Sequence, residues 1–375
     1  AHFEEAGSVR INCDTATKSG DLTVTTPPTA TFTRASVAYL PDGTKVTVNN
    51  PRYVDGKFNK AVLVEEGTTN LVPNPLAKDN LTGIGYFFSG GSAGIIERST
   101  SLPSGCPWLT GVKVTITTAG TDANVIFKQT DGSEATTGIP VTAGATYTYS
   151  IWLYIPSESG ITQLQLRPIE RNSSGKVVED SALVSFNTKG AWQRVVATWT
   201  LQSTTAKVTL RVRAYGTGVF YVTACMLEQK PYATSFIDGT RAAETLTIPT
   251  AGVLSASEGT VEFWVIPQQP DNVSSSIEIT RNDFLWGVPG STGFLLRRRT
   301  GTSPAYEAHI WLPDQLVATK SMSFPVGTPV YVAFRWSSAG CALFINGVLA
   351  GSTSNTFTAP TDTVAYLGKR PNYPE

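Results

Sequence analysis

The sequence contains few residues that could support metal or acid–base chemistry. Only two histidines are present, His2 and His309, and His309 lies between apolar residues of a strand-like segment, where a packed or surface role is expected. The four cysteines lie far apart and fit no metal-binding spacing: Cys13, Cys106, Cys225 and Cys341. We interpret them as buried thiols; disulfides are the alternative, and the sequence does not choose among the pairings.

Charge and long apolar runs are also scarce. Charged residues make up 15% of the chain, and 29 basic residues balance 29 acidic ones. This balance gives no electrostatic reason to expect nucleic acid as a partner. No apolar run approaches the roughly 20 residues of a membrane span, so no membrane insertion is expected. Because weak charge repulsion tolerates close self-association, a homo-oligomer is expected.

The sequence also lacks the usual arrangements of hydrolytic residues. A glycoside hydrolase needs two carboxylates flanking the scissile bond. The nearest fragment has Glu278 and Asp283 five residues apart, which places them on opposite faces of a strand. Residues 297–299, three consecutive arginines, are expected on an ordinary polar strand, with binding of an anionic glycan as the alternative. We therefore expect no enzymatic activity.

The residues that are abundant indicate β-structure. The chain has 33 glycines and 23 prolines, and short runs of β-branched and aromatic residues lie between turn-forming residues. Thr146–Tyr154 and Thr260–Ile266 are two such runs, and each has a tryptophan in its second half. The sequence predicts an all-β protein: two antiparallel β-sandwiches (jelly rolls), preceded by an irregular N-terminal segment.

Three segments follow from this pattern. Residues 1–66 form the irregular segment, which is too small to bury a core alone and is expected to pack on a neighbouring domain or, as an assembly segment, on a partner subunit. Residues 67–243 form the first sandwich, and residues 244–375 the second. The strands expected in the first are Val112–Thr117, Val125–Gln129, Thr146–Ile155, Thr162–Arg171, Ala182–Asn187, Trp192–Leu201, Ala206–Tyr215 and Gly218–Glu228. Those expected in the second are Gly259–Pro267, Ser276–Thr280, Asp283–Val288, Gly293–Arg299, Tyr306–Leu312, Gln315–Lys320, Pro329–Ser337, Cys341–Ile345 and Thr363–Gly368.

Alternation along three strands of the first sandwich predicts a binding face. Successive side chains of a strand point to opposite faces of its sheet. If the three strands share one sheet, its outer face carries Trp152, Tyr154, Gln165, Arg167, Arg211, Arg213 and Tyr215.

Two interpretations of this face remain open. Flat aromatic rings stack on sugar rings, and arginine and glutamine match pairs of hydroxyl groups, so these residues are candidates for carbohydrate binding. Alternatively, long arginine stems cover aromatic surface, or another part of the protein packs there.

The first sandwich resembles the carbohydrate-binding modules of families 4 and 9. The resemblance is carried by VTAGATYTYSIWLYI, GAWQRVVATWTL and the Leu227-Glu228 pair, with NLVPNP at residues 70–75 as the opening motif. It implies a jelly roll. These families often hold a structural calcium near an acidic pair, but here Thr223-Ala224 stands at that position. The departure argues against calcium, and no cofactor is expected.

A second resemblance spans about 240 residues. ATFTRASVA, NPRY, LVEEGTTNL and LEQKPYATSFIDGTR follow one another in an order similar to that of bacteriophage tail and virion proteins, often ahead of a lectin-like domain. The last 130 or so residues resemble the laminin-G/concanavalin A-like sandwich, through TVEFWVIP, PVYVAFRW, ALFINGVLAGS and AYLGKR. Such a domain normally ends with one further strand. We expect a truncated or processed C-terminus, or completion of the domain by another part of the chain.

These resemblances imply a non-enzymatic bacteriophage virion protein, as a tail fibre, head fibre or adhesion component. Its expected partners are a host cell-surface glycan and other virion proteins, and its expected location is the virion. One alternative is a purely architectural capsid-decoration or fibre subunit. Another is the accessory carbohydrate-binding region of a secreted bacterial enzyme, located at the cell surface or outside the cell.

Overall fold

The computed structural model describes residues 30–249, 255, 257–268, 326–356 and 364–367 in full, together with the backbone course of six further strands. The chain divides into two compact units. Unit 1 contains residues 1–40, 46–67 and 242–375, and unit 2 contains residues 41–45 and 68–241. The sandwich of unit 2 is therefore inserted in the sequence of unit 1. Nearly all described residues in regular structure lie in β-strands, as the sequence predicts.

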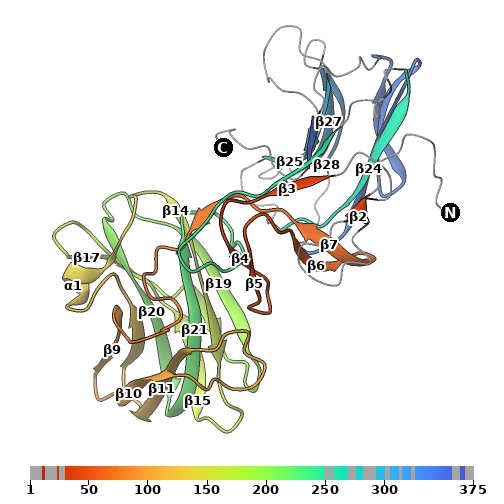
Figure 1. The fold of residues 1–375 in the computed structure, drawn as a ribbon. Helices are drawn as coiled ribbons and strands as arrows, with labels where there is room; N and C mark the ends of the chain where they lie inside the picture. Colours follow the sequence, from red (N-terminus) through yellow and green to blue (C-terminus); the bar gives the residue numbers. More distant parts are fainter. Residues whose placement is uncertain are drawn as a thin grey trace. The chain divides into compact units, whose positions relative to one another are not determined.

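Unit 2 is an antiparallel sandwich of two sheets (Figure 1). One sheet has five strands, in the order β10 (Ala93–Ser99), β11 (Gly111–Thr118), β21 (Gly218–Glu228), β14 (Thr146–Tyr154) and β19 (Gln193–Thr200). The path of the other runs β17 (Val177–Asp180), β16 (Ile169–Arg171), β20 (Lys207–Gly216), β12 (Asp122–Phe127) and β9 (Ile84–Ser89). Three more strands attach to it: β13 (Ile139–Pro140), β15 (Ile161–Leu166) and β18 (Val184–Phe186). The unit also contains α1 (Glu134–Thr137) and a short pair formed by β8 (Thr68–Thr69) and β22 (Thr240–Arg241).

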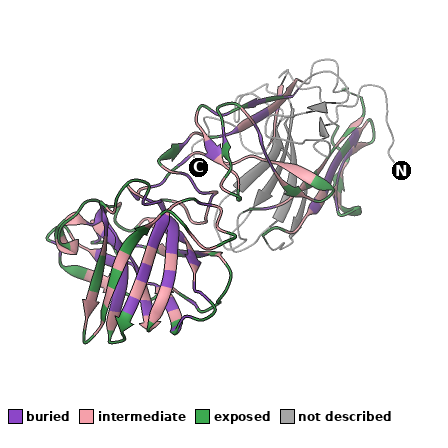
Figure 2. Cartoon of the chain, turned by 60° about the horizontal axis from the view of Figure 1, so that its bottom comes forward, coloured by how far each residue is buried: buried purple, intermediate pink, exposed green. Residues whose placement is uncertain are grey.

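The core of unit 2 lies between its two sheets. Buried residues alternate with more exposed ones along several strands (Figure 2). The inward row of β14 is fully buried, as alternation predicts: Tyr147, Tyr149, Ile151 and Leu153. The opposing rows come from β15 and β20: Leu164, Leu166, Val208, Leu210, Val212 and Ala214. Full burial of one such aliphatic side chain stabilises the fold by about 1.5–3 kcal/mol.

The strands of unit 2 differ from expectation in several places, and the short strands β13 and β17 are among those that were not predicted. The strand predicted over Thr162–Arg171 is broken into β15 and β16, and Pro168 lies in the break, where it has no N–H to donate. Strands β9 and β10 were not predicted, because glycines interrupt their apolar pattern. Gly94 is required in β10, since a Cβ atom there would lie 2.4 Å from the carbonyl oxygen of Thr115 on the neighbouring strand.

Unit 1 contains a seven-stranded and a four-stranded antiparallel sheet. The larger runs β28 (Gln315–Ser321), β27 (Ala305–Trp311), β26 (Gly293–Arg299), β25 (Ser276–Arg281), β32 (Val364–Leu367), β23 (Thr245–Pro249) and β3 (Thr31–Thr33). The smaller runs β24 (Gly259–Val265), β29 (Val330–Ser337), β30 (Gly340–Ile345) and β31 (Val348–Thr353).

The predicted Asn346-Gly347 turn joins β30 to β31, and both residues have positive φ. Strand β6 (Arg52–Gly56) pairs with β7 (Asn59–Leu63), and β1 (Ile11–Asn12) with β2 (Thr23–Val24). Two short strands near the start of the chain are β4 (Ala38–Tyr39) and β5 (Lys45–Val46).

Apart from residues 41–45, the N-terminal segment is part of unit 1 and does not form a body of its own. Strand β3 pairs with β23, which in turn pairs with β32 near the end of the chain. Phe32 and Leu246 lie opposite each other in this pairing, and both are buried. A distant part of the chain therefore adds a strand to the sheet that contains β32.

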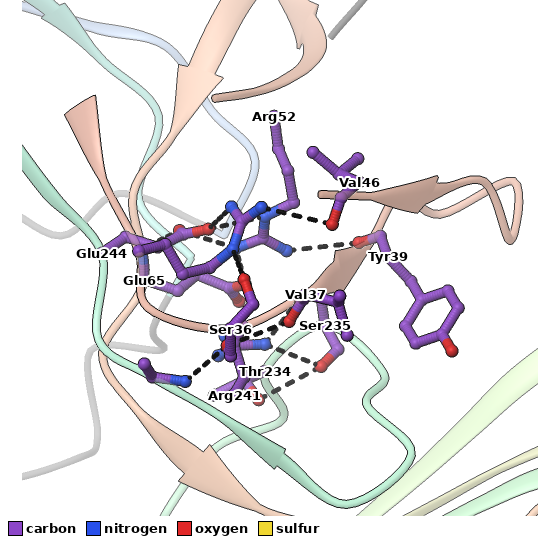
Figure 3. Close-up of polar contacts among 12 residues, drawn as sticks. Ser36, Val37, Tyr39, Val46, Arg52, Glu65, Thr234, Ser235, Arg241 and Glu244 are labelled. Atoms are coloured by element: carbon purple, nitrogen blue, oxygen red, sulfur yellow. Dashed lines mark hydrogen bonds and ion pairs between the residues drawn. The ribbon is translucent and has the colours of Figure 1, made fainter. Parts of the chain in front are cut away.

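A buried ionic network fixes the N-terminal segment to the start of β23 (Figure 3). Both oxygens of Glu244 accept hydrogen bonds from Arg52, at 2.8 and 2.7 Å, and one also accepts from Arg34 at 2.8 Å. Arg52 also contacts Glu65 at 2.7 Å, and the Glu65 backbone N–H donates to Glu244. Burial alone would lower the pKa of Arg52, but the carboxylates of Glu65 and Glu244 outweigh it, so the pKa is raised. The arginines of TFTRAS and NPRY and the first glutamate of LVEEGTTNL are therefore structural residues.

A second recurrent motif has a structural role in unit 2. Glu228 is buried and accepts hydrogen bonds from the backbone N–H and the hydroxyl of Thr234 and from the hydroxyl of Thr68. Burial raises the pKa of Glu228, and these hydrogen bonds partly offset the rise. The LEQKPYATS segment is thereby folded back onto its own strand β21.

Several sequence predictions lie outside the described residues. They concern Cys13, His2, the strand at Asp283–Val288, and the side chains of Glu278, His309 and residues 297–299. Cys225 is a buried thiol and Cys106 a half-buried one, and neither forms a disulfide. Within the described part of the chain, no helix has the length and apolarity of a membrane span. The same residues include no cluster of three or more side chains suited to a metal ion.

Candidate functional site

The seven predicted site residues do not share one sheet. Trp152 and Tyr154 lie on β14, in the five-stranded sheet. Gln165 lies on β15, with Arg167 directly after it, and β15 pairs with β20 in the opposite sheet. The single face that the alternation predicted is therefore wrong for the two β14 residues. The pairing of β14 with β21, which a strand pattern alone does not reveal, separates them from the others.

The other five predicted residues come together on the outer face of the β20 sheet. Register places Gln165 beside Arg213 and Gln163 beside Tyr215. On the other side of β20, Asn124 lies beside both Arg213 and Phe87. Side chains opposite each other in an antiparallel pair lie on the same face. We define the β20 face as Phe87, Asn124, Gln163, Gln165, Arg167, Arg211, Arg213 and Tyr215.

Each arginine of the β20 face has an acidic partner. Arg167 contacts Asp180, and this hydrogen bond is the main cause of its raised pKa. Arg211 contacts Glu134 of α1, and Arg213 lies 3.5 Å from Asp122. Because each positive charge is matched locally, the face carries little net charge.

Aromatic rings and amide groups lie between these ion pairs. The Arg213 guanidinium is 5.1 Å from the ring centroid of Tyr215, and the Arg211 guanidinium is 5.3 Å from that of Phe87. The Tyr215 hydroxyl donates to the Gln165 side-chain oxygen at 3.0 Å. Phe87 remains 42% exposed. The face thus offers open ring surface beside polarised hydrogen-bonding groups.

Two buried polar atoms of the β20 face have unused hydrogen-bonding capacity. The side-chain oxygen of Asn124, which is 1% exposed, and Nε of Arg213 have no hydrogen-bond partner among the described residues. A buried polar group without a partner costs about 1–3 kcal/mol, so such groups call for an explanation. Both atoms are covered by protein, so a buried water is the group that would supply a partner.

Trp152 and Tyr154 belong to a separate cluster on the outer face of the five-stranded sheet. Tyr154 packs against Trp192, with ring centroids 5.3 Å apart, and against Tyr221 at 6.2 Å. The indole N–H of Trp192 donates to the backbone carbonyl of Pro103 at 3.0 Å. We call Trp152, Tyr154, Trp192 and Tyr221 the β14 face. Tyr154 contacts the rings of both Trp192 and Tyr221, which fits a packing role as well as a binding role.

Sequence reasoning missed part of the β20 face. Phe87 and Asn124 lie on β9 and β12, and their alternation carries the signal only once the pairing with β20 is known. Glu134 lies in the four-residue helix α1, which is too short to be recognised from periodicity. All three residues lie outside the strands that the sequence predicted.

Residues 238–375 match the family described as the concanavalin A-like lectin/glucanases superfamily. No curated protein sequence matches the chain. Among solved structures, the chain is similar to the enzymatically active domain of tailspike protein 4 of bacteriophage CBA120, with 12% identity and a TM-score of 0.33 over 45% of this chain and 22% of that one. It is similar to a carbohydrate-binding module of the β-sandwich superfamily, with 16% identity and a TM-score of 0.35 over 60% and 86% of the two chains.

A third similarity is to the CBM22-1 xylan-binding domain of Paenibacillus barcinonensis, with 8% identity and a TM-score of 0.31 over 46% of this chain and all of that one. None of these structures places a ligand or a site residue on this chain. The family match agrees with the laminin-G/concanavalin A-like sandwich expected for the last third of the sequence. The C-terminal part of the chain is therefore similar to the concanavalin A-like lectin/glucanases superfamily.

Proposed function

We propose that this protein binds glycans, without catalysing a reaction, through the β20 face of unit 2. The observation that carries the proposal is the central cross-strand row, in which Phe87, Asn124, Arg213 and Gln165 succeed one another over four strands. An exposed ring at one end supplies stacking surface for the apolar side of a sugar. The half-buried Gln165 amide and Arg213 guanidinium of the row match pairs of sugar hydroxyls, whereas Asn124 is buried.

The charge pattern supports an uncharged glycan as the ligand. The three arginines of the face are matched by Asp180, Glu134 and Asp122. An anionic glycan would have to compete with these carboxylates for each guanidinium. Binding of an uncharged glycan should accordingly be insensitive to salt, because no counterion is displaced.

The same pairings support a non-enzymatic role. A glycosidase needs one carboxyl group that donates a proton and a second that acts as base or nucleophile. On the β20 face, Asp180 and Glu134 are each held by an arginine, and the short contact between Glu134 and Arg211 leaves that carboxylate engaged. We therefore place the function in recognition and not in cleavage.

We further propose that the protein is an adhesion component of a bacteriophage virion. The four recurrent motifs occur in order between Ala30 and Arg241, ahead of most of the residues that match the concanavalin A-like superfamily. Four motif residues make contacts that hold the fold together: Arg34, Arg52, Glu65 and Glu228. The motifs therefore support an architecture shared with the proteins that carry them. A neighbourhood of capsid and tail genes would support this assignment, and a catalytic domain encoded in the same reading frame would instead favour an accessory region of a secreted enzyme.

The binding proposal is tested on a glycan array with the whole chain and two variants. Tyr215→Ala removes a ring of the β20 face, and Trp152→Ala removes a ring of the opposite sheet as a matched control. We expect binding to an uncharged glycan that Tyr215→Ala weakens and Trp152→Ala preserves. Loss of binding only in Trp152→Ala would move the site to the β14 face. Absence of binding by folded wild-type protein would contradict the proposal.

A further inference from the structure

Three aromatic side chains gather on the outer face of the four-stranded sheet of unit 1. Trp264 on β24 lies directly opposite Tyr331 on β29, and their ring centroids are 5.4 Å apart with planes at 46°. Phe58, in the turn between β6 and β7, meets Trp264 edge-on at 5.4 Å. We call Phe58, Trp264 and Tyr331 the aromatic cluster.

The aromatic cluster is open to solvent. Phe58 is 61% exposed and Trp264 43% exposed. Along β24, Val261, Phe263 and Val265 are half-buried while Glu262 and Trp264 are exposed, so Trp264 stands on the outward row. Neighbouring exposed aromatic rings that are fixed on a rigid sheet are characteristic of binding surfaces.

Charged groups of both signs border the rings. The ammonium group of Lys57 lies 5.4 Å from the Trp264 ring centroid. On the other side, the hydroxyl of Tyr331 donates a hydrogen bond to Glu262. Burial and this hydrogen bond raise the pKa of Tyr331 to about 12, so the hydroxyl remains protonated at neutral pH. The cluster therefore combines ring surface with one cationic donor and one anionic acceptor.

We propose that the aromatic cluster is a second glycan-binding site, which stacks an uncharged sugar ring and uses Lys57 and Glu262 for its hydroxyls. The charged border favours a sugar over a protein partner, because the core of a protein interface is depleted of charged residues. Phe58 and Lys57 lie in the N-terminal segment, outside the residues that match the lectin family. The site thus combines residues of the N-terminal segment with residues of the C-terminal part of unit 1. It shares only its ligand class with the proposed function and none of its residues.

The test uses the full chain in a Tyr215→Ala background, so that the β20 face does not mask a second site. Trp264→Ala and Phe58→Ala are compared with Val348→Ala, a control that truncates an exposed side chain on β31 of the same sheet. Each is screened on an array of uncharged oligosaccharides, and the strongest array ligand is then titrated by calorimetry. Circular dichroism and thermal unfolding establish that each variant is folded.

We expect Trp264→Ala and Phe58→Ala each to weaken binding about tenfold, the size of effect that loss of one base-stacking ring has in proteins that bind single-stranded nucleic acid, with Val348→Ala unchanged. Unchanged binding in both would overturn this site and leave the β20 proposal intact. Loss in these variants without any effect of Tyr215→Ala would support this site and contradict the β20 face. Conversion of a dimer to a monomer by Trp264→Ala, measured by sedimentation velocity, would overturn it in favour of a second copy of the chain as the occupant.

Discussion

At the scale of single residues, the arginines and glutamates of the recurrent motifs stabilise the fold. Glu244 is fully buried and its two oxygens are shared by two guanidinium groups. Removal of one partner of a buried ion pair leaves the other charge uncompensated in a medium of low polarity. The network therefore makes the N-terminal segment depend on Glu244, which lies 210 positions after Arg34 and 192 after Arg52.

The first prediction concerns this network. Glu244→Gln should lower the free energy of unfolding by about 3–5 kcal/mol, because Arg34 and Arg52 lose their shared carboxylate. Urea denaturation measures the change. Asp55→Asn is the control, since the Asp55–Lys60 pair is exposed and exposed pairs contribute little. Equal urea midpoints for the two variants would contradict the structural role given to Glu244.

The second prediction concerns pH. The raised pKa means that folded Glu228 keeps its proton to a higher pH than the unfolded chain does. The cost of burying its charge is absent below the ordinary glutamate pKa of about 4.3 and fully present above the raised value. Wild-type protein should therefore lose stability relative to Glu228→Gln as the pH rises through this window. Urea midpoints of both proteins across the window measure this, and a difference that does not vary with pH would count against it.

At the scale of elements, strand pairing decides which side chains can act together. The outward row of β14 and that of β20 both followed from alternation, but their assignment to one sheet was wrong. Alternation is a local property of a strand, whereas the neighbour of a strand is set by contacts between distant residues. The same reasoning explains why Phe87 and Asn124 joined the site only in the structure.

The third prediction concerns β3, the strand that the N-terminal segment adds to unit 1. Phe32 is buried opposite Leu246, so Phe32→Ala should cost about 3–5 kcal/mol and loosen the β3–β23 pairing. Hydrogen–deuterium exchange should show faster exchange over residues 31–33 and 245–249, with the strands of unit 2 unchanged. Phe58→Ala, an exposed phenylalanine in the same segment, is the control. Exchange over residues 31–33 and 245–249 that is no faster in Phe32→Ala than in Phe58→Ala would contradict the role of β3.

At the scale of the whole molecule, much of the fold could be predicted from sequence. The all-β class, the two sandwiches, the inward rows of β14, β15 and β20 and the lectin-like C-terminal part follow from alternation, turn residues and resemblance. The insertion of unit 2 within unit 1 could not be predicted, because it depends on the pairing of β3 with β23 and on the Glu244 network. The β3–β23 pairing links residues more than 200 positions apart, and the Glu244 network links residues 179 to 210 positions apart.

The fourth prediction follows from two binding sites in one chain. On a surface that carries the bound oligosaccharide densely, dissociation of wild-type protein should be slower than that of either Tyr215→Ala or Trp264→Ala, because engagement of one site raises the effective concentration at the other. Surface plasmon resonance at low and high ligand density measures this. Dissociation rates that do not depend on density would show that a single site binds at a time.

The central claim is that the β20 face binds the glycan, and a hydrogen–deuterium exchange footprint tests it most directly. The protein is compared with and without the soluble oligosaccharide that gives the strongest array signal. The account predicts protection concentrated in β15, β20 and the facing part of β12. Protection confined to β14 and β19, or absence of protection in unit 2 at saturating ligand, would contradict it.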